Sequence, residues 1–196
     1  MSHRLLLINA YLSQVILLVV AVLLLWLLPL QRRDIAIFFH WPSFAELAVG
    51  IGGALIVLCI EWVLSKTMSK DLLDDGGINQ ALFAPLSYHH MIFLCLVVSF
   101  VEEALFRVVL QTQFGLILAA LLFAFVHFRY VKRPFLLVFV TLVSFWMGFL
   151  FQVTASFWTV VIAHTIINLA AGLQLKKREN ELHDKSTGGD CDANKS

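Results

Sequence analysis

The chain has 196 residues, of which 60% are hydrophobic and only 14% are charged, and its mean hydropathy is +0.87. This composition is typical of a protein that crosses a membrane several times, so we expect membrane lipids around it. The formal net charge is only +1, and the charges gather between apolar runs and in the C-terminal tail, which argues against nucleic acid as a partner.

Six apolar segments follow one another along the chain, and most are close to the roughly 20 residues that a helix needs to cross a bilayer. The fourth is short; in chain order the segments cover about 5–30, 44–65, 89–112, 115–128, 135–152 and 155–175. None shows the period-two alternation of a barrel strand, and only helices or closed barrels satisfy their backbone groups in hydrocarbon. The predicted fold is therefore an all-α integral membrane protein: one bundle of about six transmembrane helices with an intramembrane polar site.

The ends of the chain and the short loops predict its domain limits and its orientation. The first segment is too long for the core of a signal peptide and is predicted to be a retained span. Residues 1–178 form the predicted transmembrane domain, and residues 179–196 contain too few apolar side chains to order, which predicts a disordered cytoplasmic tail. By the positive-inside rule we expect a multi-pass protein of the cell membrane with both termini in the cytoplasm, because one side collects Arg4, Lys66, Lys70, Arg129, Lys132, Arg133, Lys176, Lys177 and Arg178 against only Arg32 and Arg33.

Three charged residues, Glu102, Glu103 and Arg107, lie inside the otherwise apolar third segment. A charge at this depth costs roughly 2.5–3.5 kcal/mol on insertion scales, so the three side chains need polar partners or a function. Glu103 stands four residues before Arg107, the favourable order for a pair within one helix, while Glu102 points about 100° away. The spacing predicts a Glu103–Arg107 pair and leaves Glu102 free to face another helix. A purely structural ion-pair cluster is the simpler alternative.

Polar residues also occur at depth in the fourth and sixth segments. His127 follows Phe123 by four residues, and Asn168 follows His164 by four, so the members of each pair share a helix face. At 1.5 Å per residue, Glu102, His127, His164 and Asn168 all lie roughly 13–19 Å from the far-side ends of their helices. This estimate places a tight turn at 111–113, and it predicts that Glu102 and His127 meet in one layer with the residues of the sixth segment.

The ordered set of motifs resembles that of the CPBP intramembrane proteases, the group that contains the type II CAAX prenyl endopeptidase and bacteriocin-processing relatives. The resemblance covers about residues 89–175 and rests on three elements, Glu102-Glu103-x3-Arg107, Phe123-x3-His127 and His164-x3-Asn168. It implies hydrolysis of a peptide bond in a membrane-associated protein or peptide. It also implies that Glu102 is the general base, assisted by His127, and that His164 and Asn168 stabilise the oxyanion, with Glu103 and Arg107 in support.

Other functions use the same residues. A glutamate and two histidines resemble a catalytic zinc set, with Glu102, His127 and His164 as ligands, but the chain has no His-Glu-x2-His motif, and we expect no cofactor. A non-catalytic scaffold or immunity-type peptide binder, and a small proton-coupled transporter, also remain open.

Overall fold

The protein is described here by a computed structural model that covers residues 2–28 and 35–188. Every regular element in these two ranges is helical, which confirms the all-α prediction. In chain order the elements are α1 (His3–Leu27), the 3-10 turn η1 (Ile37–Phe39), α3 (Phe44–Thr67), α4 (Lys70–Leu73), α5 (Ile78–Phe83), α6 (Tyr88–Glu103), the π-helix η2 (Ala104–Gln111), α7 (Thr112–Val126), the 3-10 turn η3 (Phe128–Lys132), α8 (Pro134–Thr154) and α9 (Phe157–Gly188).

Helix boundaries follow local signals in the sequence. At the start of α3, the Ser43 side chain accepts a hydrogen bond from the Glu46 backbone while the Glu46 carboxylate accepts one from the Ser43 backbone, which is a capping box. Pro134 begins α8, where its missing N–H and fixed φ suit the first turn. Ala155, at φ 47°, ends α8 in the left-handed conformation that often terminates helices. These signals separate the long apolar runs into distinct helices.

Within the described chain, five stretches of helix are long and apolar enough to cross a membrane. They are His3–Leu27, Phe44–Thr67, Tyr88–Val126, Pro134–Thr154 and Phe157–Leu182. The third and fourth predicted segments together make up the 39-residue stretch Tyr88–Val126, so these five stretches correspond to the six predicted segments. The outer faces of α1 and α3 expose many large apolar side chains, as lipid-facing helices do.

The 39-residue run is bent back on itself rather than straight. Gly115 has φ 82° and ψ 168°, a conformation that glycine adopts without a steric penalty and that interrupts the helix. Beyond it α7 returns along η2, and the rings of Phe106 and Phe123 lie 4.9 Å apart although they are far apart in sequence. The turn predicted at 111–113 is therefore wrong, because these residues are helical and the glycine after them carries the reversal.

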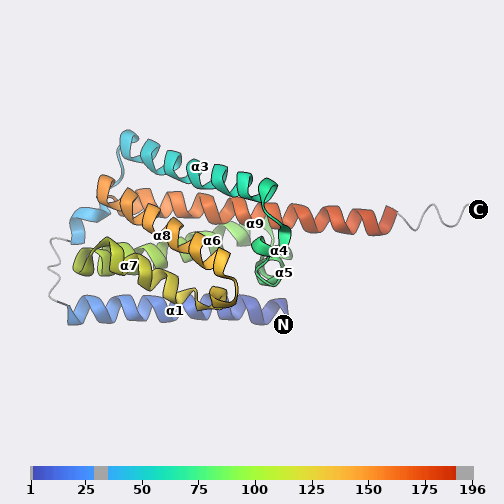
Figure 1. Ribbon diagram of the computed structural model, residues 1–196. Helices are drawn as coiled ribbons and strands as arrows, with labels where there is room; N and C mark the ends of the chain where they lie inside the picture. Colours follow the sequence, from blue (N-terminus) through green and yellow to red (C-terminus); the bar gives the residue numbers. More distant parts are fainter. Residues whose placement is uncertain (1, 29–34, 189–196) are drawn as a thin grey trace, which may run out of the picture.

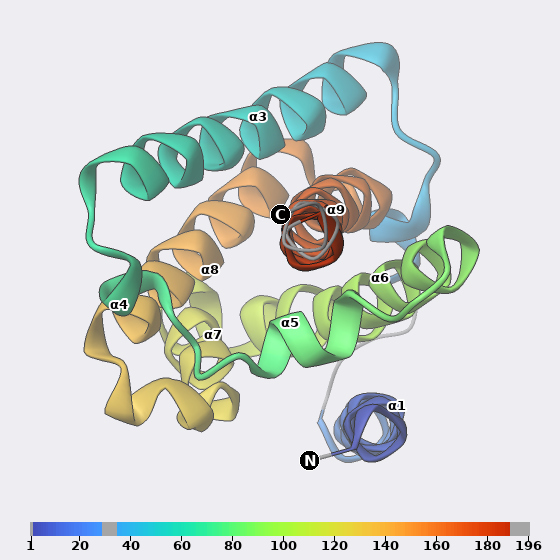
Figure 2. The ribbon, with the colours of Figure 1, turned by 90° about the vertical axis from the view of Figure 1, so that its right-hand side faces the viewer.

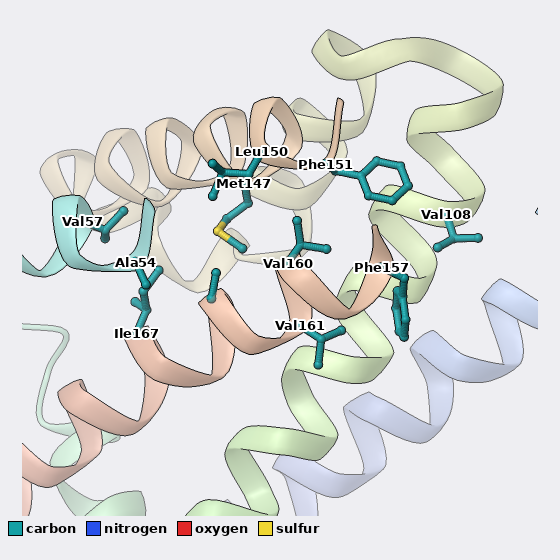
Figure 3. Packing of buried hydrophobic residues seen from close by; sticks show 11 residues of the cluster. Ala54, Val57, Val108, Met147, Leu150, Phe151, Phe157, Val160, Val161 and Ile167 are labelled. Atoms are coloured by element: carbon teal, nitrogen blue, oxygen red, sulfur yellow. The ribbon is translucent and has the colours of Figure 1, made fainter. Parts of the chain in front are cut away.

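Helix α9 lies at the centre of the bundle, with α3, α8 and α6 around it and α1 at the edge (Figure 2). Apolar side chains from α3, α8 and α9 interlock in the main core, as Met147, Leu150 and Val160 illustrate (Figure 3). Two glycines of α3 allow this close approach: a Cβ at Gly50 would lie 2.7 Å from Thr159 Cγ2, and one at Gly53 would lie 2.5 Å from Leu150 Cδ1. The centre of the bundle is thus tightly packed around the helix that carries His164.

The C-terminal half of α9 extends beyond the rest of the bundle, at the same end as the start of α1 and the short helices α4 and α5 (Figure 1). Residues 179–188 are helical, where the sequence predicted a disordered tail. Adding turns to an existing helix avoids the cost of nucleation, and Lys177 Nζ lies 3.9 Å from Glu181 Oε1, one turn further along the helix. The remainder of that predicted tail, 189–196, lies outside the described residues. Both described ends share one side of the bundle, and which side is cytoplasmic stays a prediction.

Candidate active site

The candidate site is centred on Glu102 and Glu103, the last two residues of α6. Both are buried, Glu103 completely and Glu102 with 7% of its surface exposed. The chain passes directly from these residues into the π-helix η2, an unusual geometry that occurs frequently at functional sites. The two adjacent acids make different contacts.

Both carboxylate oxygens of Glu103 are bound. Arg107 Nε donates to Glu103 Oε2 at 2.9 Å, and His164 Nδ1 donates to Glu103 Oε1 at 2.7 Å. Arg107 is itself fully buried and donates from Nη2 to Ser144 Oγ of α8 at 3.1 Å. The four side chains thus form one hydrogen-bonded chain from α8 through η2 and α6 to α9. The paired arrangement of Glu103 and Arg107, expected from their spacing, is present.

A glycine of α8 provides the space for this network. A Cβ at Gly148 would lie 2.3 Å from Leu116 Cδ1, 2.7 Å from Gln111 Oε1 and 3.1 Å from Arg107 Nη1. The Gly148 carbonyl also accepts a hydrogen bond from Gln111 Nε2 at 2.8 Å. Any larger residue at this position would displace the side chains that hold η2 against α8.

Glu102 has weaker and fewer partners. Gln14 Nε2 of α1 donates to Glu102 Oε1 at 3.4 Å, and Glu102 Oε2 lies 4.0 Å from His164 Nε2, too far for a direct hydrogen bond. Because His164 Nδ1 is bound to Glu103, its second nitrogen is the one that faces Glu102. Glu102 is therefore a buried carboxylate with one long hydrogen bond and a histidine nitrogen nearby.

His127 lies at the C-terminal cap of α7 and contacts the site through aromatic packing. Its Nδ1 donates to the Phe123 carbonyl at 2.8 Å, and its ring stacks on Phe123 with centroids 4.6 Å apart. The ring of Phe123 also lies 6.3 Å from that of His164, so the two histidines flank it. The direct Glu102–His127 contact that the spacing suggested is not present: the partners of Glu102 are Gln14 and His164. The helix ends at His127, and its ring satisfies a carbonyl left free there.

Asn168 lies one turn after His164 on α9 and is half-buried. Its side chain makes no hydrogen bond to another described residue, and the convergence of His164 and Asn168 on one oxygen stays a prediction. Across residues 2–28 and 35–188, no three His, Cys, Asp or Glu side chains are grouped as metal ligands.

Two contributors to the site were missed by the sequence reasoning. Gln14 binds Glu102 from α1, and Ser144 binds Arg107 from α8. Gln14 had a usable signal, since an amide within an apolar run of membrane-spanning length needs a polar partner. Ser144 had none, because a serine in a membrane helix commonly bonds to its own backbone.

Two comparisons with known proteins indicate the family of this chain. A family model described as type II CAAX prenyl endopeptidase Rce1-like matches residues 84–170, a range that contains all six predicted site residues. A Bacillus subtilis (strain 168) protein named YpbD, itself described as uncharacterized, is 37% identical over 144 residues, or 74% of this chain and 76% of that protein. The chain belongs to the Rce1-like family.

This assignment confirms the resemblance that the three motifs suggested, and it points to a protease in the broad sense of a peptide-bond hydrolase. No solved structure matches the chain. Of the residues that line the site, Gln14 lies outside the range that the Rce1-like model matches.

Proposed function

We propose that this Rce1-like protein is an intramembrane endopeptidase of glutamic type that hydrolyses a peptide bond in a membrane-associated protein or peptide. The observation that carries the proposal is the unequal binding of the two adjacent acids. Glu103 has both oxygens engaged and no exposure, whereas Glu102 has a single 3.4 Å hydrogen bond and 7% exposure. A general base must be able to take up a proton, and Glu102 is the acid that is free to do so.

In the proposed mechanism, Glu102 removes a proton from a water molecule and the resulting hydroxide attacks the scissile carbonyl carbon. Negative charge then develops on the carbonyl oxygen, and donors aimed at that position lower the barrier. We assign this role to His164 Nε2 and the Asn168 amide. Donation from Nε2 requires a proton on both ring nitrogens. The positive charges of Arg107 and His164 are then set against two carboxylates, with Glu103 bound to both groups and Glu102 4.0 Å from His164 Nε2. The leaving amine receives its proton from Glu102 or from His127.

Glu103, Arg107 and Ser144 hold the orientation of His164 in this scheme. A carboxylate that binds one imidazole nitrogen fixes the direction of the ring and therefore of the other nitrogen. The guanidinium of Arg107 supports that carboxylate from the opposite side, and Ser144 anchors the guanidinium to α8. These residues position the reacting groups without reaching the substrate.

The protein is proposed to act in the cell membrane with both termini in the cytoplasm, from the distribution of basic residues among the short loops of the sequence. Its substrates are membrane-associated, because the site lies among helices that are long and apolar enough to cross the bilayer. The family name makes a prenylated CAAX peptide the first substrate class to test.

The test compares cells that produce the wild type with cells that produce Glu102→Gln at equal level. New protein N-termini in the membrane fraction are mapped by mass spectrometry, and prenylated CAAX peptides are incubated with both purified proteins. The proposal expects termini or peptide products that appear only with the wild type. If the folded wild type yields none, while it still retains bound peptides or partner proteins, the chain is a non-catalytic binder and the proposal fails.

A further inference from the structure

The N-terminal helix α1 sends one polar side chain into the site. Most of α1 is apolar and faces outward, but Gln14 is 94% buried. Its Nε2 donates to Glu102 Oε1, while its Oε1 is buried without a hydrogen-bond partner among the described residues. This carbonyl oxygen belongs to the same small amide group as the nitrogen that binds the carboxylate, so it lies beside the proposed base.

We infer that Gln14 is part of the catalytic site: its amide N–H positions Glu102, and its free amide oxygen accepts a hydrogen bond from a backbone N–H of the bound peptide. The inference rests on the proposed function and extends it to α1.

A packing role alone does not account for Gln14. The contacts of α1 that follow Gln14 are apolar, since Leu17 and Ala21 join the cluster around Phe106. Its other polar contacts, from His3 and Tyr11, lie nearer the start of the helix. An apolar residue at position 14 would continue this surface without burying an unpaired oxygen, which costs free energy in hydrocarbon. A side chain that keeps such an oxygen next to a reactive carboxylate is better explained by a ligand that pairs with it.

The chemistry of a peptide substrate fits the unpaired oxygen. A peptide bond presents an N–H donor as well as the carbonyl that is attacked, and a donor that enters a dry site needs an acceptor. The carboxylate of Glu102 is occupied with the water, and both oxygens of Glu103 are already bound. Gln14 Oε1 is an acceptor that remains free next to the reacting carboxylate.

Kinetics of Gln14→Met test the role, with a peptide that the wild type cleaves as substrate. Methionine has a similar size and favours helix, but it provides neither the donor nor the acceptor. We expect kcat to fall at least about tenfold, because a misplaced base loses near-attack geometry, and KM to rise as the acceptor is lost. The matched control is Asn9→Leu, which removes an exposed amide from the same helix and should leave both constants unchanged. Equal constants for Gln14→Met and Asn9→Leu would overturn the inference.

The contact itself is tested without activity by melting temperatures in detergent. Glu102→Met strands a buried amide and Gln14→Met strands a buried acid, whereas the double variant leaves neither unpaired. We expect the double variant to melt about 2 °C or more above the value given by adding the two single effects. Strict additivity would show that the two side chains do not interact. If the melting temperatures are non-additive but the wild type cleaves no peptide, the contact between Gln14 and Glu102 is supported and the proposed protease activity is wrong.

Discussion

His164 on the central helix binds Glu103, the second of the two adjacent acids, with 2.7 Å between His164 Nδ1 and Glu103 Oε1. The first acid, Glu102, is thereby left opposite the second nitrogen of the same ring, at 4.0 Å. One histidine thus lies between two carboxylates that have different partners.

Glu102→Gln should leave the protein folded and remove nearly all cleavage. The substitution keeps the size of the side chain and alters only two long contacts, the 3.4 Å hydrogen bond from Gln14 and the 4.0 Å separation from His164 Nε2, so the melting temperature in detergent should change little. Removal of a general base lowers kcat by about 10²–10⁴-fold. A purified, folded Glu102→Gln variant with wild-type turnover would exclude Glu102 as the base.

Glu103→Gln and Arg107→Gln should each lower stability as well as activity. Either change strands a fully buried charge, which typically costs about 3–5 kcal/mol. The melting temperature in detergent is the measurement, and Glu102→Gln is the matched control because it makes the same chemical change one residue away. If both variants melt like the wild type, the pair has no supporting role.

Gly148→Ala should destabilise the protein by about 1–3 kcal/mol, because overpacking forces neighbouring side chains to move. The added Cβ would lie 2.3 Å from Leu116 Cδ1 and 2.7 Å from Gln111 Oε1. Gly52→Ala is the control: it is also a glycine within a long apolar helix, but a Cβ there meets nothing within 4 Å. Thermal melting and the cleavage assay should both separate the two variants, and equal behaviour would contradict the packing shown here.

Cleavage should persist after exhaustive chelation, and the purified protein should hold no stoichiometric zinc. In the proposed mechanism the attacking water is activated by a carboxylate, whereas a zinc enzyme loses its Lewis acid and its activated water with the metal. Elemental analysis beside a cleavage assay, with and without chelator, makes the comparison. One zinc per chain, with activity lost on chelation and restored by zinc, would recast Glu102, His127 and His164 as ligands.

The sequence predicted the features that depend on one helix at a time. Apolar run length gave the all-α membrane bundle, and the four-residue spacing gave the pairing of Glu103 with Arg107. Contacts between helices were harder to predict, since they depend on how each helix is rotated about its own axis and on where it ends. His127 illustrates this, because it is the residue at which α7 stops, so its ring binds a free carbonyl and not Glu102.

The helices that supply Gln14 and Ser144 are separated from α6 by long stretches of chain. No local spacing rule connects Gln14 of α1 with Glu102 of α6. The same is true of Ser144 in α8 and Arg107 in η2. Burial of an amide or a charge in an apolar run signals only that some partner exists. The identity of the partner follows from packing that a single sequence does not specify.

The contacts between η2 and α8 repeat with the same interval on both helices. Arg107 binds Ser144, and four residues later on each helix Gln111 binds the Gly148 carbonyl. A slide of one helix past the other by a turn would break both hydrogen bonds. The shifted register would bring only one of the two side chains to a new partner, Arg107 to Gly148 or Gln111 to Ser144, and leave the other unpaired in an apolar interior. The two hydrogen bonds together therefore fix the position of η2 along α8. Because Glu102 and Glu103 directly precede η2, their height in the bundle is fixed as well.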